Sequence, residues 1–375
     1  MALDHNYSGS PEEGVRDMLR AGLDVDCAFG SGIALDAQTV SSALRMGVIT
    51  EADIETALRH LFMVRMRIGH FDPDGPLQKI TESVICSDEH AATARAGAAQ
   101  GSTLLKNDNL TLPLKTTLGS VAVVGPNSDL SKAIAGYYGA GDACGMKFST
   151  MVDAVTAYVP RTTFAKGILH GVLSNDTSGL ANATAAAKAA DATVLVLGTD
   201  LSTAHEGHDA TDLSFSATQL KLAAAVATAA AGKPVVVVVM SAVPLDLSPL
   251  LANKAIGAIL HVGQPSVQTL GVGDVLFGVV APAGKMVQTL YPVSVQHELS
   301  IFDMNMRPGP SLYPRPDGQG CTPGSKTVPC SSGTNTGTCT PDINCMMVTV
   351  SIEIDEFCIE NDELCIENDG FCIEK

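Results

Sequence analysis

Carboxylates and imidazoles cluster in one stretch of this sequence, directly after a short apolar run. Thr193–Leu197 is continuous in apolar and β-branched residues, which predicts a buried parallel strand. Ligands of open α/β sheets bind in the crevice beyond the carboxyl ends of the strands. The loop that follows the run is therefore the first candidate for an active site, and its reactive side chains are those of His205, Glu206, His208 and Asp209.

Two kinds of chemistry are open to this loop. Glu206 can act as a general acid if burial raises its pKa so that it stays protonated, and the alternative is a solvated or ion-paired loop carboxylate. His205 and His208 are of a type that binds metal ions, together with the two nearby carboxylates. Exposed loop histidines are common, so no metal and no other cofactor is predicted.

Composition excludes several classes of protein. The chain has 375 residues, enough for two domains or slightly more, and its 46% hydrophobic content is ample for a core. A formal net charge of −17 argues against binding to nucleic acid or to anionic membrane surfaces. The N-terminus has neither the basic nor the apolar region of a signal peptide, and no apolar run reaches the length of a membrane span.

Residues 1–72 are predicted to be mainly helical. Ser10 followed by Pro11 and Glu13 has the pattern of a capped helix start, and Thr50 opens another helix that Gly69 ends. A further helix is expected near residues 37–46 and a short strand at residues 23–26. Residues 73–103 are predicted to be a linker with one helix, capped by Ser87.

From Ser120 onward strands alternate with helices, which favours a mainly parallel sheet covered by helices. The fold class predicted for residues 104–300 is therefore an α/β sandwich. Its strands are expected at residues 121–124, 193–197, 234–240 and 255–260, and its helices at residues 181–190, 216–231 and near the end of 267–277.

The C-terminal part of the sequence has a different character. Residues 301–354 contain much Pro, Gly, Ser, Thr and Cys with little periodicity, and irregular structure is expected there. Residues 355–375 repeat an acidic, cysteine-containing heptad three times. Such spacing suggests a coiled coil, but a solvated low-complexity tail is favoured. Only three of the ten cysteines lie before residue 321.

Several blocks between residues 6 and 314, in the same order, resemble glycoside hydrolase family 3, and in particular its β-xylosidase-like branch. The blocks that carry this resemblance are Ala21-Gly22-Leu23-Asp24-Val25-Asp26-Cys27, Leu104-Leu105-Lys106-Asn107-Asp108, Val124-Gly125-Pro126-Asn127, Asp274-Val275-Leu276-Phe277-Gly278 and Met304-Asn305-Met306-Arg307-Pro308.

The resemblance implies a site shared between two domains. In such enzymes a (β/α)8-type barrel supplies an aspartate nucleophile within a Ser-Asp-(Trp or Cys) motif, and the α/β sandwich supplies the acid/base. Retaining glycosidases need both groups. The helices of residues 1–72 then correspond to the end of the barrel, and the nucleophile motif would fall before Met1. The 375 residues alone are accordingly expected to be inactive on a β-xyloside.

The branch pattern Glu-Ala-Glu-Gly-x-Asp-Arg stands here as Ala204-His205-Glu206-Gly207-His208-Asp209-Ala210. By resemblance Glu206 is the candidate acid/base, unless that role belongs to the position now held by Ala204. Asp209, His205 and His208 are the candidate substrate-binding residues. In other branches the acid/base lies in a segment that corresponds to residues 263–268, which contain no carboxylate here. Asp274 is expected to be structural.

Three functions compete. The first is hydrolysis of terminal β-linked xylosyl, arabinosyl or glucosyl residues, with a xylo-oligosaccharide or another β-glycoside as partner, in a family whose members are usually secreted. The second is a non-catalytic sugar-binding or scaffold protein built from the same domain. The third, from fold alone, is a flavodoxin-like cofactor binder. The third is the weakest, because Gly125-Pro126-Asn127 has a proline where phosphate-binding amides are needed. This segment is expected to be a backbone turn, and lining of the cleft is its second interpretation. The same holds for residues 136–139.

Overall fold

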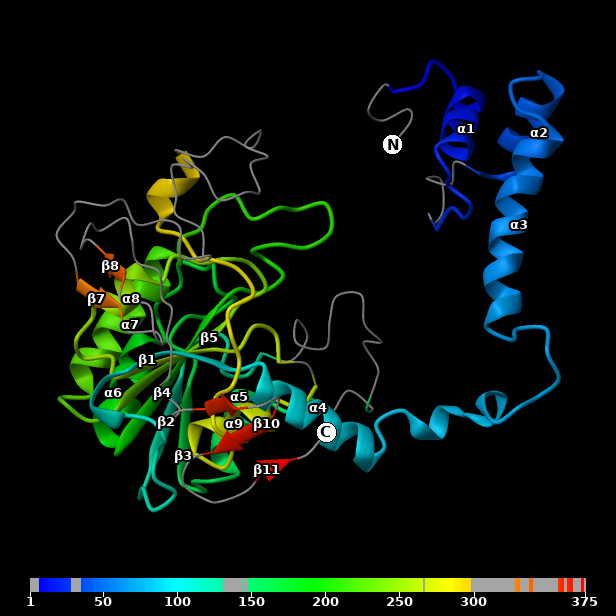
Figure 1. Cartoon of the computed structure of the whole chain (residues 1–375). Coiled ribbons are helices and arrows are strands. Elements are labelled where there is room, and N and C mark those ends of the chain that lie inside the picture. Colours follow the sequence, from blue (N-terminus) through cyan, green and yellow to red (C-terminus); the bar gives the residue numbers. More distant parts are fainter. Residues whose placement is uncertain are drawn as a thin grey trace. The chain divides into compact units, whose positions relative to one another are not determined.

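The computed structural model describes residues 7–27, 35–130, 144, 148–265 and 267–297, and the backbone of five short strands farther along the chain (Figure 1). The chain divides into two compact units, residues 1–83 and residues 84–375. Each unit has its own hydrophobic core. Within the described residues no helix is long and apolar enough to cross a membrane.

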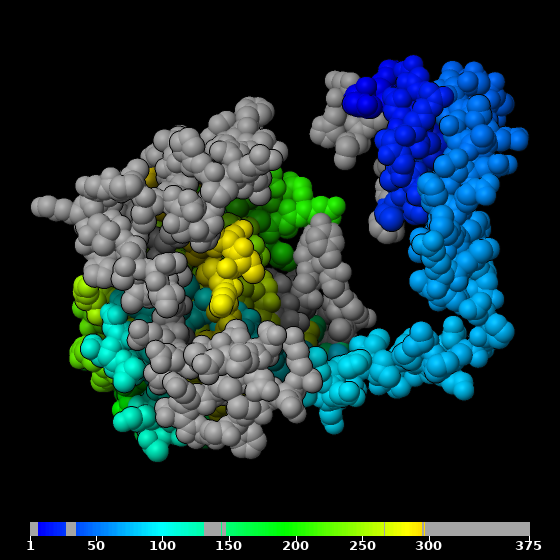
Figure 2. Space-filling view, viewed as in Figure 1, coloured from blue at the N-terminus to red at the C-terminus, as the bar shows by residue number. Residues whose placement is uncertain are grey.

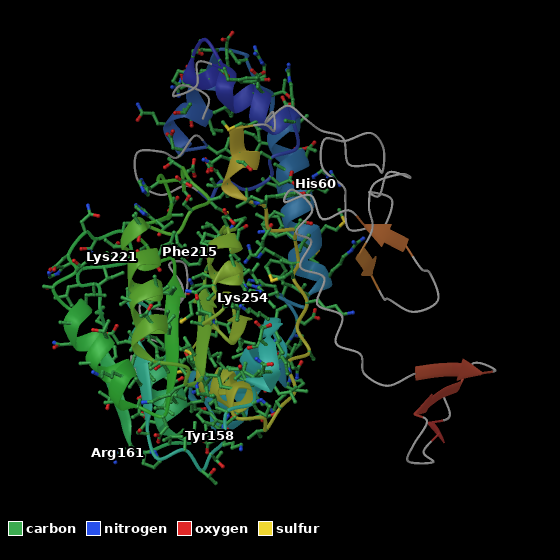
Figure 3. All side chains as sticks on the ribbon, turned by 90° about the vertical axis from the view of Figure 1, so that its left-hand side faces the viewer. His60, Tyr158, Arg161, Phe215, Lys221 and Lys254 are labelled. Atoms are coloured by element: carbon green, nitrogen blue, oxygen red, sulfur yellow. A yellow bond between two sulfur atoms is a disulfide. The ribbon has the colours of Figure 1, made fainter. Side chains whose placement is uncertain are left out.

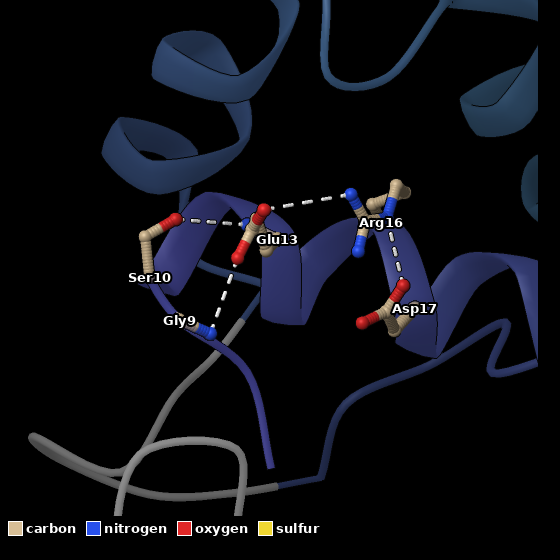
Figure 4. A network of polar contacts seen from close by, with 5 residues as sticks. All are labelled: Gly9, Ser10, Glu13, Arg16 and Asp17. Carbon is tan, nitrogen blue, oxygen red and sulfur yellow. Dashed lines mark hydrogen bonds and ion pairs between the residues drawn. The ribbon is translucent and has the colours of Figure 1, made fainter. Parts of the chain in front are cut away.

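The N-terminal unit contains three α-helices: α1 (Pro11–Arg20), α2 (Ala37–Arg45) and α3 (Glu51–Arg67). The predicted start of α1 is confirmed, because Ser10 Oγ accepts a hydrogen bond from Glu13 N at 3.2 Å and Glu13 Oε2 accepts one from Gly9 N at 3.1 Å (Figure 4). These bonds satisfy amide groups that the first helical turn leaves unpaired. The short strand predicted at residues 23–26 is wrong, since no partner strand lies beside it in the described residues.

The core of this unit is small. Val15, Ala43 and Ile49 are at most 2% exposed, and α1 packs beside α2 (Figure 2). On α3, by contrast, Leu58 is 45% exposed and Met66 is 65% exposed. Helix α3 therefore carries exposed apolar surface.

The second unit begins at residue 84, after the 3-10 helices η2 (Leu77–Lys79) and η3 (Glu82–Val84). Its first α-helix, α4 (Asp88–Gln100), is capped by Ser87 as predicted, with Ser87 Oγ accepting from His90 N at 3.3 Å. A disulfide joins Cys86 to Cys144, whose Cα atoms are 5.2 Å apart. No spacing motif in the sequence identifies this pair of cysteines.

A six-stranded sheet with the order β1-β6-β5-β4-β2-β3 forms the centre of the second unit. Strand β1 runs antiparallel to β6, and every other pair is parallel, which confirms the predicted α/β class. The strands are β1 (Thr103–Asn107), β2 (Val121–Val124), β3 (Thr162–Ala165), β4 (Ala192–Gly198), β5 (Val235–Met240) and β6 (Ala258–His261).

Helices cover both faces of this sheet. One core cluster joins the strands to α4, α5 (Met151–Thr156) and α9 (Leu270–Leu276). The other joins them to α6 (Leu180–Ala189), α7 (Ala217–Ala229) and α8 (Ser248–Ala252). Because successive strand residues point to opposite faces, Val236 and Val238 belong to the first cluster while Val235 and Val237 belong to the second. This two-sided burial explains the continuous valine run of β5.

One partly buried ion pair joins the helices that cover the first face of the sheet. Arg95 of α4 donates to Asp274 of α9 through Nε at 2.7 Å and through Nη2 at 2.5 Å, and Tyr158 donates its hydroxyl to the same carboxylate. Burial raises the pKa of Asp274, but the hydrogen bonds from Arg95 and Tyr158 outweigh it and hold that pKa below its usual value. Asp274 is therefore structural, as predicted.

Short antiparallel strands are described in the C-terminal region: β7 (Val328–Cys330), β8 (Gly337–Cys339), β9 (Phe357–Glu360), β10 (Glu363–Ile366) and β11 (Cys372–Ile373). The described heptad residues are extended, so a coiled coil is wrong for them. The Met304–Pro308 block, the turn expected at residues 136–139 and most of residues 301–354 lie outside the described residues.

Candidate active site

The chain turns out of the sheet at the end of β4. Gly198 has φ +149, and a Cβ at this position would lie 1.8 Å from the carbonyl oxygen of Met240. The buried side chain of Gln219 holds this strand end. Its Oε1 accepts from Gly198 N at 2.9 Å and its Nε2 donates to Gly198 O at 3.0 Å. Only glycine fits at residue 198, which is the point where the chain leaves strand β4.

A cavity of about 820 Å³ lies at this carboxyl end of the sheet. Phe215, near the start of α7, and Arg161, before β3, mark the two opposite ends of the sheet in Figure 3. The loop after β4 supplies most of the lining, and residues 242–244 after β5 supply another part. Gln264, after β6, and Gln296, in the 3-10 helix η6 (Val293–His297), complete the wall. The cavity therefore lies beyond the carboxyl ends of the strands, where the sequence predicts a site.

Three of the four predicted site residues, His205, Glu206 and His208, form the tip of a hairpin, and Asp209 follows it directly. His205 N donates to His208 O and His208 N donates to His205 O, both at 2.9 Å, and Glu206 and Gly207 make the turn between them. Gly207 has φ +77, which the third position of such a turn requires. The two imidazole rings stack with centroids 5.1 Å apart, and His205 Nδ1 lies 2.9 Å from the carbonyl oxygen of Leu201.

Glu206 and Asp209 line the cavity and are exposed. The burial that would keep a general acid protonated is therefore not supplied around Glu206 by the described residues. Ala204 and Ala210, which replace the Glu and Arg of the branch pattern, also line the cavity. Among the described residues no group of three or more His, Cys, Asp or Glu side chains is arranged to hold a metal ion.

Polar side chains outside the hairpin fix the loop in place, and of these Asp200 and Asp246 were not predicted to do so. Asp200 accepts hydrogen bonds from Val172 N at 3.0 Å and from Ser202 N at 2.8 Å, which joins the loop to the segment before α6. Asp246 accepts from Val293 N at 3.1 Å and so holds the start of η6. Asn127 is fully buried and donates through Nδ2 to Thr199 O at 2.9 Å. Gly125-Pro126-Asn127 is thus a structural turn, as expected, and lies outside the cavity lining.

A half-buried histidine ends the neighbouring strand β6. His261 accepts a hydrogen bond from Gly263 N at Nδ1, 3.4 Å away, and burial lowers its pKa below the usual value. The imidazole is therefore held neutral as part of the strand end. Among the described residues of the cavity wall, only His205 and His208 carry an imidazole.

A family model described as the glycosyl hydrolase family 3 C-terminal domain matches residues 102–319. The chain belongs to this family of glycoside hydrolases, and the α/β sandwich is the family's C-terminal domain. The family resemblance seen in the sequence is confirmed.

Relatives in plants are similar over most of this chain. The probable beta-D-xylosidase 7 of Arabidopsis thaliana is 38% identical over 306 residues, which are 80% of this chain and 38% of the relative. Beta-xylosidase/alpha-L-arabinofuranosidase 2 of Medicago sativa subsp. varia is 35% identical over 317 residues, 83% of this chain and 39% of the relative.

A solved structure is also similar, that of the GH3 exo-beta-xylosidase XlnD in complex with a xylobiose aziridine activity-based probe. It superimposes with a TM-score of 0.72 at 29% identity and covers 82% of this chain and 39% of that one. The chain thus spans at most 39% of the length of these relatives.

Proposed function

We propose that this chain supplies the acid/base side of a site that hydrolyses terminal β-linked xylosyl residues, with Glu206 as the acid/base. Membership of family 3 and the xylosidase names of its relatives support the reaction class. One observation supports the residue assignment: Glu206 and Asp209, at and directly after the hairpin tip, line the cavity at the carboxyl end of the sheet.

In this proposal Glu206 protonates the glycosidic oxygen as the sugar leaves, and later removes a proton from the attacking water. The nucleophile comes from the other domain, in the Ser-Asp-(Trp or Cys) motif that is not found among these 375 residues. Asp209, His205 and His208 bind sugar hydroxyls beside it. Exposure of Glu206 in this chain is compatible with the role if the barrel and the substrate cover the hairpin and so raise the pKa on closure.

A chimera tests the role of Glu206. It joins the N-terminal part of a family β-xylosidase to residues 84–375 of this chain, and Glu206→Gln is introduced into it. We expect kcat for xylobiose to fall about 10²–10⁴-fold, because the sugar leaving group needs a proton. With 2,4-dinitrophenyl β-xyloside, whose leaving group needs none, the loss should be far smaller.

Glu89→Gln is the matched control, since Glu89 is exposed on α4 of the same unit and does not line the cavity. It should leave both rates unchanged. Equal losses on the two substrates in Glu206→Gln would contradict an acid/base role.

The 375-residue chain by itself should release no nitrophenol from 4-nitrophenyl β-xyloside. Turnover by this chain that Glu206→Gln abolishes would show that its own residues provide the nucleophile. A spectrophotometric assay with the unsubstituted protein and that variant decides the matter.

The second candidate is a non-catalytic sugar-binding or scaffold protein. Two observations favour it: Glu206 is exposed, and alanines stand at residues 204 and 210 on the cavity wall. Xylobiose binding without any turnover in the chimera would support it over the first.

A further inference from the structure

The two histidines of the hairpin face each other across its turn. His205 and His208 exchange backbone hydrogen bonds in both directions, each at 2.9 Å, so they lie directly opposite each other on one face of the hairpin. Their rings stack with centroids 5.1 Å apart, and both residues are exposed and line the cavity. Neither histidine belongs to the branch pattern, which has alanine at the first position and no fixed residue at the second. The pair is therefore a feature of this chain.

A hydrogen bond orients one of these rings as a metal ligand. His205 Nδ1 lies 2.9 Å from the carbonyl oxygen of Leu201, which can only accept, so Nδ1 carries the proton of the neutral ring and Nε2 the lone pair. Metal-binding histidines generally donate from their second ring nitrogen in this way. Two imidazole nitrogens on a tetrahedral zinc ion lie about 3.3 Å apart, a separation that facing, exposed rings can reach by rotation of their side chains.

The cavity wall carries negative charge that no basic side chain balances. Its described residues include Asp200, Glu206, Asp209 and Asp212, and none of them is a lysine or an arginine. Such a wall attracts cations. Imidazole nitrogens select zinc, copper or nickel over magnesium and calcium, which prefer oxygen ligands. The charge of the wall and the facing rings together favour a transition-metal dication.

We infer that His205 and His208 bind a divalent transition-metal ion, with water in the remaining coordination positions. Among the described residues no third His, Cys, Asp or Glu side chain is placed to complete a ligand set. The site is thus open, and its ion exchanges with the solvent, unlike the ion of a closed zinc site with four protein ligands.

The bound ion opposes the catalytic role of Glu206, and this part of the inference rests on the proposed function. A dication close to a carboxyl group favours its ionised form, whereas the acid step needs the protonated form. The ion also competes with sugar hydroxyls for the two histidines. Zinc should therefore inhibit the chimera, and EDTA should restore its rate.

Equilibrium dialysis of the 375-residue chain against Zn²⁺ measures the binding directly. Free thiols are first blocked with iodoacetamide, because cysteine thiolates also bind zinc. We expect a dissociation constant on the order of 10–100 µM, since only half of the four positions are filled by the protein. His205→Asn and His208→Asn should each weaken binding at least about tenfold, because even the loss of an outer-shell partner of a ligand costs that much.

His90→Asn is the matched control, since His90 is exposed on α4 of the same unit and does not line the cavity. It should leave the zinc affinity unchanged. Affinity should also fall when the pH is lowered from about 7.5 to about 5.5, because imidazole must be deprotonated to bind a metal ion.

Unchanged affinity in His205→Asn and His208→Asn would overturn the inference, because the ion would then bind elsewhere. Equally tight binding of Mg²⁺ would overturn it as well, since carboxylates alone would then be the ligands. Zinc binding that both variants weaken, without inhibition of the chimera, would uphold the metal site and overturn its effect on Glu206. The acid/base assignment fails separately, if Glu206→Gln has no catalytic effect in the chimera while the dialysis result stands.

Discussion

Apolar side chains are placed differently in the sandwich and in the N-terminal helices. Leu195 in β4 is 0% exposed and belongs to a cluster that joins the sheet to three helices. Leu58 in α3 is 45% exposed, although its helix is the longest of the N-terminal unit. The hydrophobic effect scales with apolar area removed from water. Apolar side chains such as Leu195 therefore stabilise the sandwich, whereas the exposed α3 surface contributes little to the fold of residues 1–83.

The largest difference in the free energy of unfolding is expected when a leucine is replaced by alanine in the sandwich and in the N-terminal unit. Leu195→Ala should lower the free energy of unfolding by about 2–5 kcal/mol, because it leaves a cavity between the sheet and the helices. Leu58→Ala should change it by less than about 0.5 kcal/mol, since water already reaches that side chain. Urea unfolding followed by circular dichroism measures both. A loss of similar size in the two variants would mean that α3 is covered in solution, and the comparison would fail.

Ion pairs offer a second contrast between the units. Arg95→Met removes the donor to Asp274, whose side chain is 9% exposed, and should cost about 2 kcal/mol because a buried carboxylate loses charge-assisted bonds. Arg95 is itself 42% exposed, so water replaces part of the lost contact. Arg16→Met breaks the contact with Asp17 at 2.7 Å, where both side chains are about 30% exposed, and should lower the free energy of unfolding much less, because solvent screens a surface pair. A smaller effect at Arg95 than at Arg16, again in urea unfolding, would contradict the structural role of Asp274.

The sequence predicted elements whose signal is local. Strands β2, β4 and β5 follow from continuous apolar runs, and α1 and α4 follow from their capping residues. Strand β3 and the short helices α5 and α8 were not predicted. Strand β3 has four residues at the edge of the sheet, two of them exposed, so it has neither the length nor the continuous burial of its neighbours. Helix α5 has six residues, too few for a periodic pattern.

The candidate site also contains residues that a local pattern predicts and residues that it does not. The loop after β4 was predicted because the apolar run, the glycine and the charged residues are consecutive. Gln264 and Gln296 were missed, because their place in the wall depends on β6 lying beside β5 and on the bond from Asp246 to η6. Such contacts arise from tertiary structure and leave no local pattern. The Cys86–Cys144 disulfide was missed for the same reason.

Acid should weaken the sandwich through His261. Its pKa is lowered by burial, so the unfolded chain, with an ordinary value of about 6.5, takes up the proton first as pH falls. The stability that His261 contributes is therefore fully present above that ordinary value and is lost as pH falls through the folded pKa. Asp274, also lowered, acts in the same direction but only near its ordinary value of 3.8 and below.

Unfolding free energies from pH 7.5 down to about pH 5 isolate the histidine, since the carboxylate stays ionised there. His261→Gln, which cannot take up a proton in this range, should flatten the slope. His60→Gln is the control in the N-terminal unit, where His60 Nδ1 lies 3.1 Å from an oxygen of Asp24 and is half exposed. A slope unchanged by His261→Gln would show that burial of this imidazole does not set the pH response.

The smallest expected difference concerns two serine caps of the same type. Ser10 Oγ accepts from Glu13 N at 3.2 Å in α1, and Ser216 Oγ accepts from Gln219 N at 3.4 Å in α7. Loss of such a cap costs about 1 kcal/mol. Ser216 Oγ also donates to Val172 O at 2.7 Å, which joins α7 to the segment beneath the cavity loop.

Ser216→Ala should therefore cost more than Ser10→Ala, by up to about 1 kcal/mol, because it removes the bond to the Val172 carbonyl as well as the cap and leaves that carbonyl only the longer bond from Gln219 Nε2 at 3.5 Å. Amide hydrogen exchange measures the two effects locally, in the first turns of α7 and α1. Ser216→Ala should also speed exchange at Val172 and Ser202, since both amides donate to Asp200 in the loop that this contact supports. Equal local losses in the two helices would show that the bond to Val172 adds nothing, and that a cap in the sandwich is worth no more than one in the N-terminal unit.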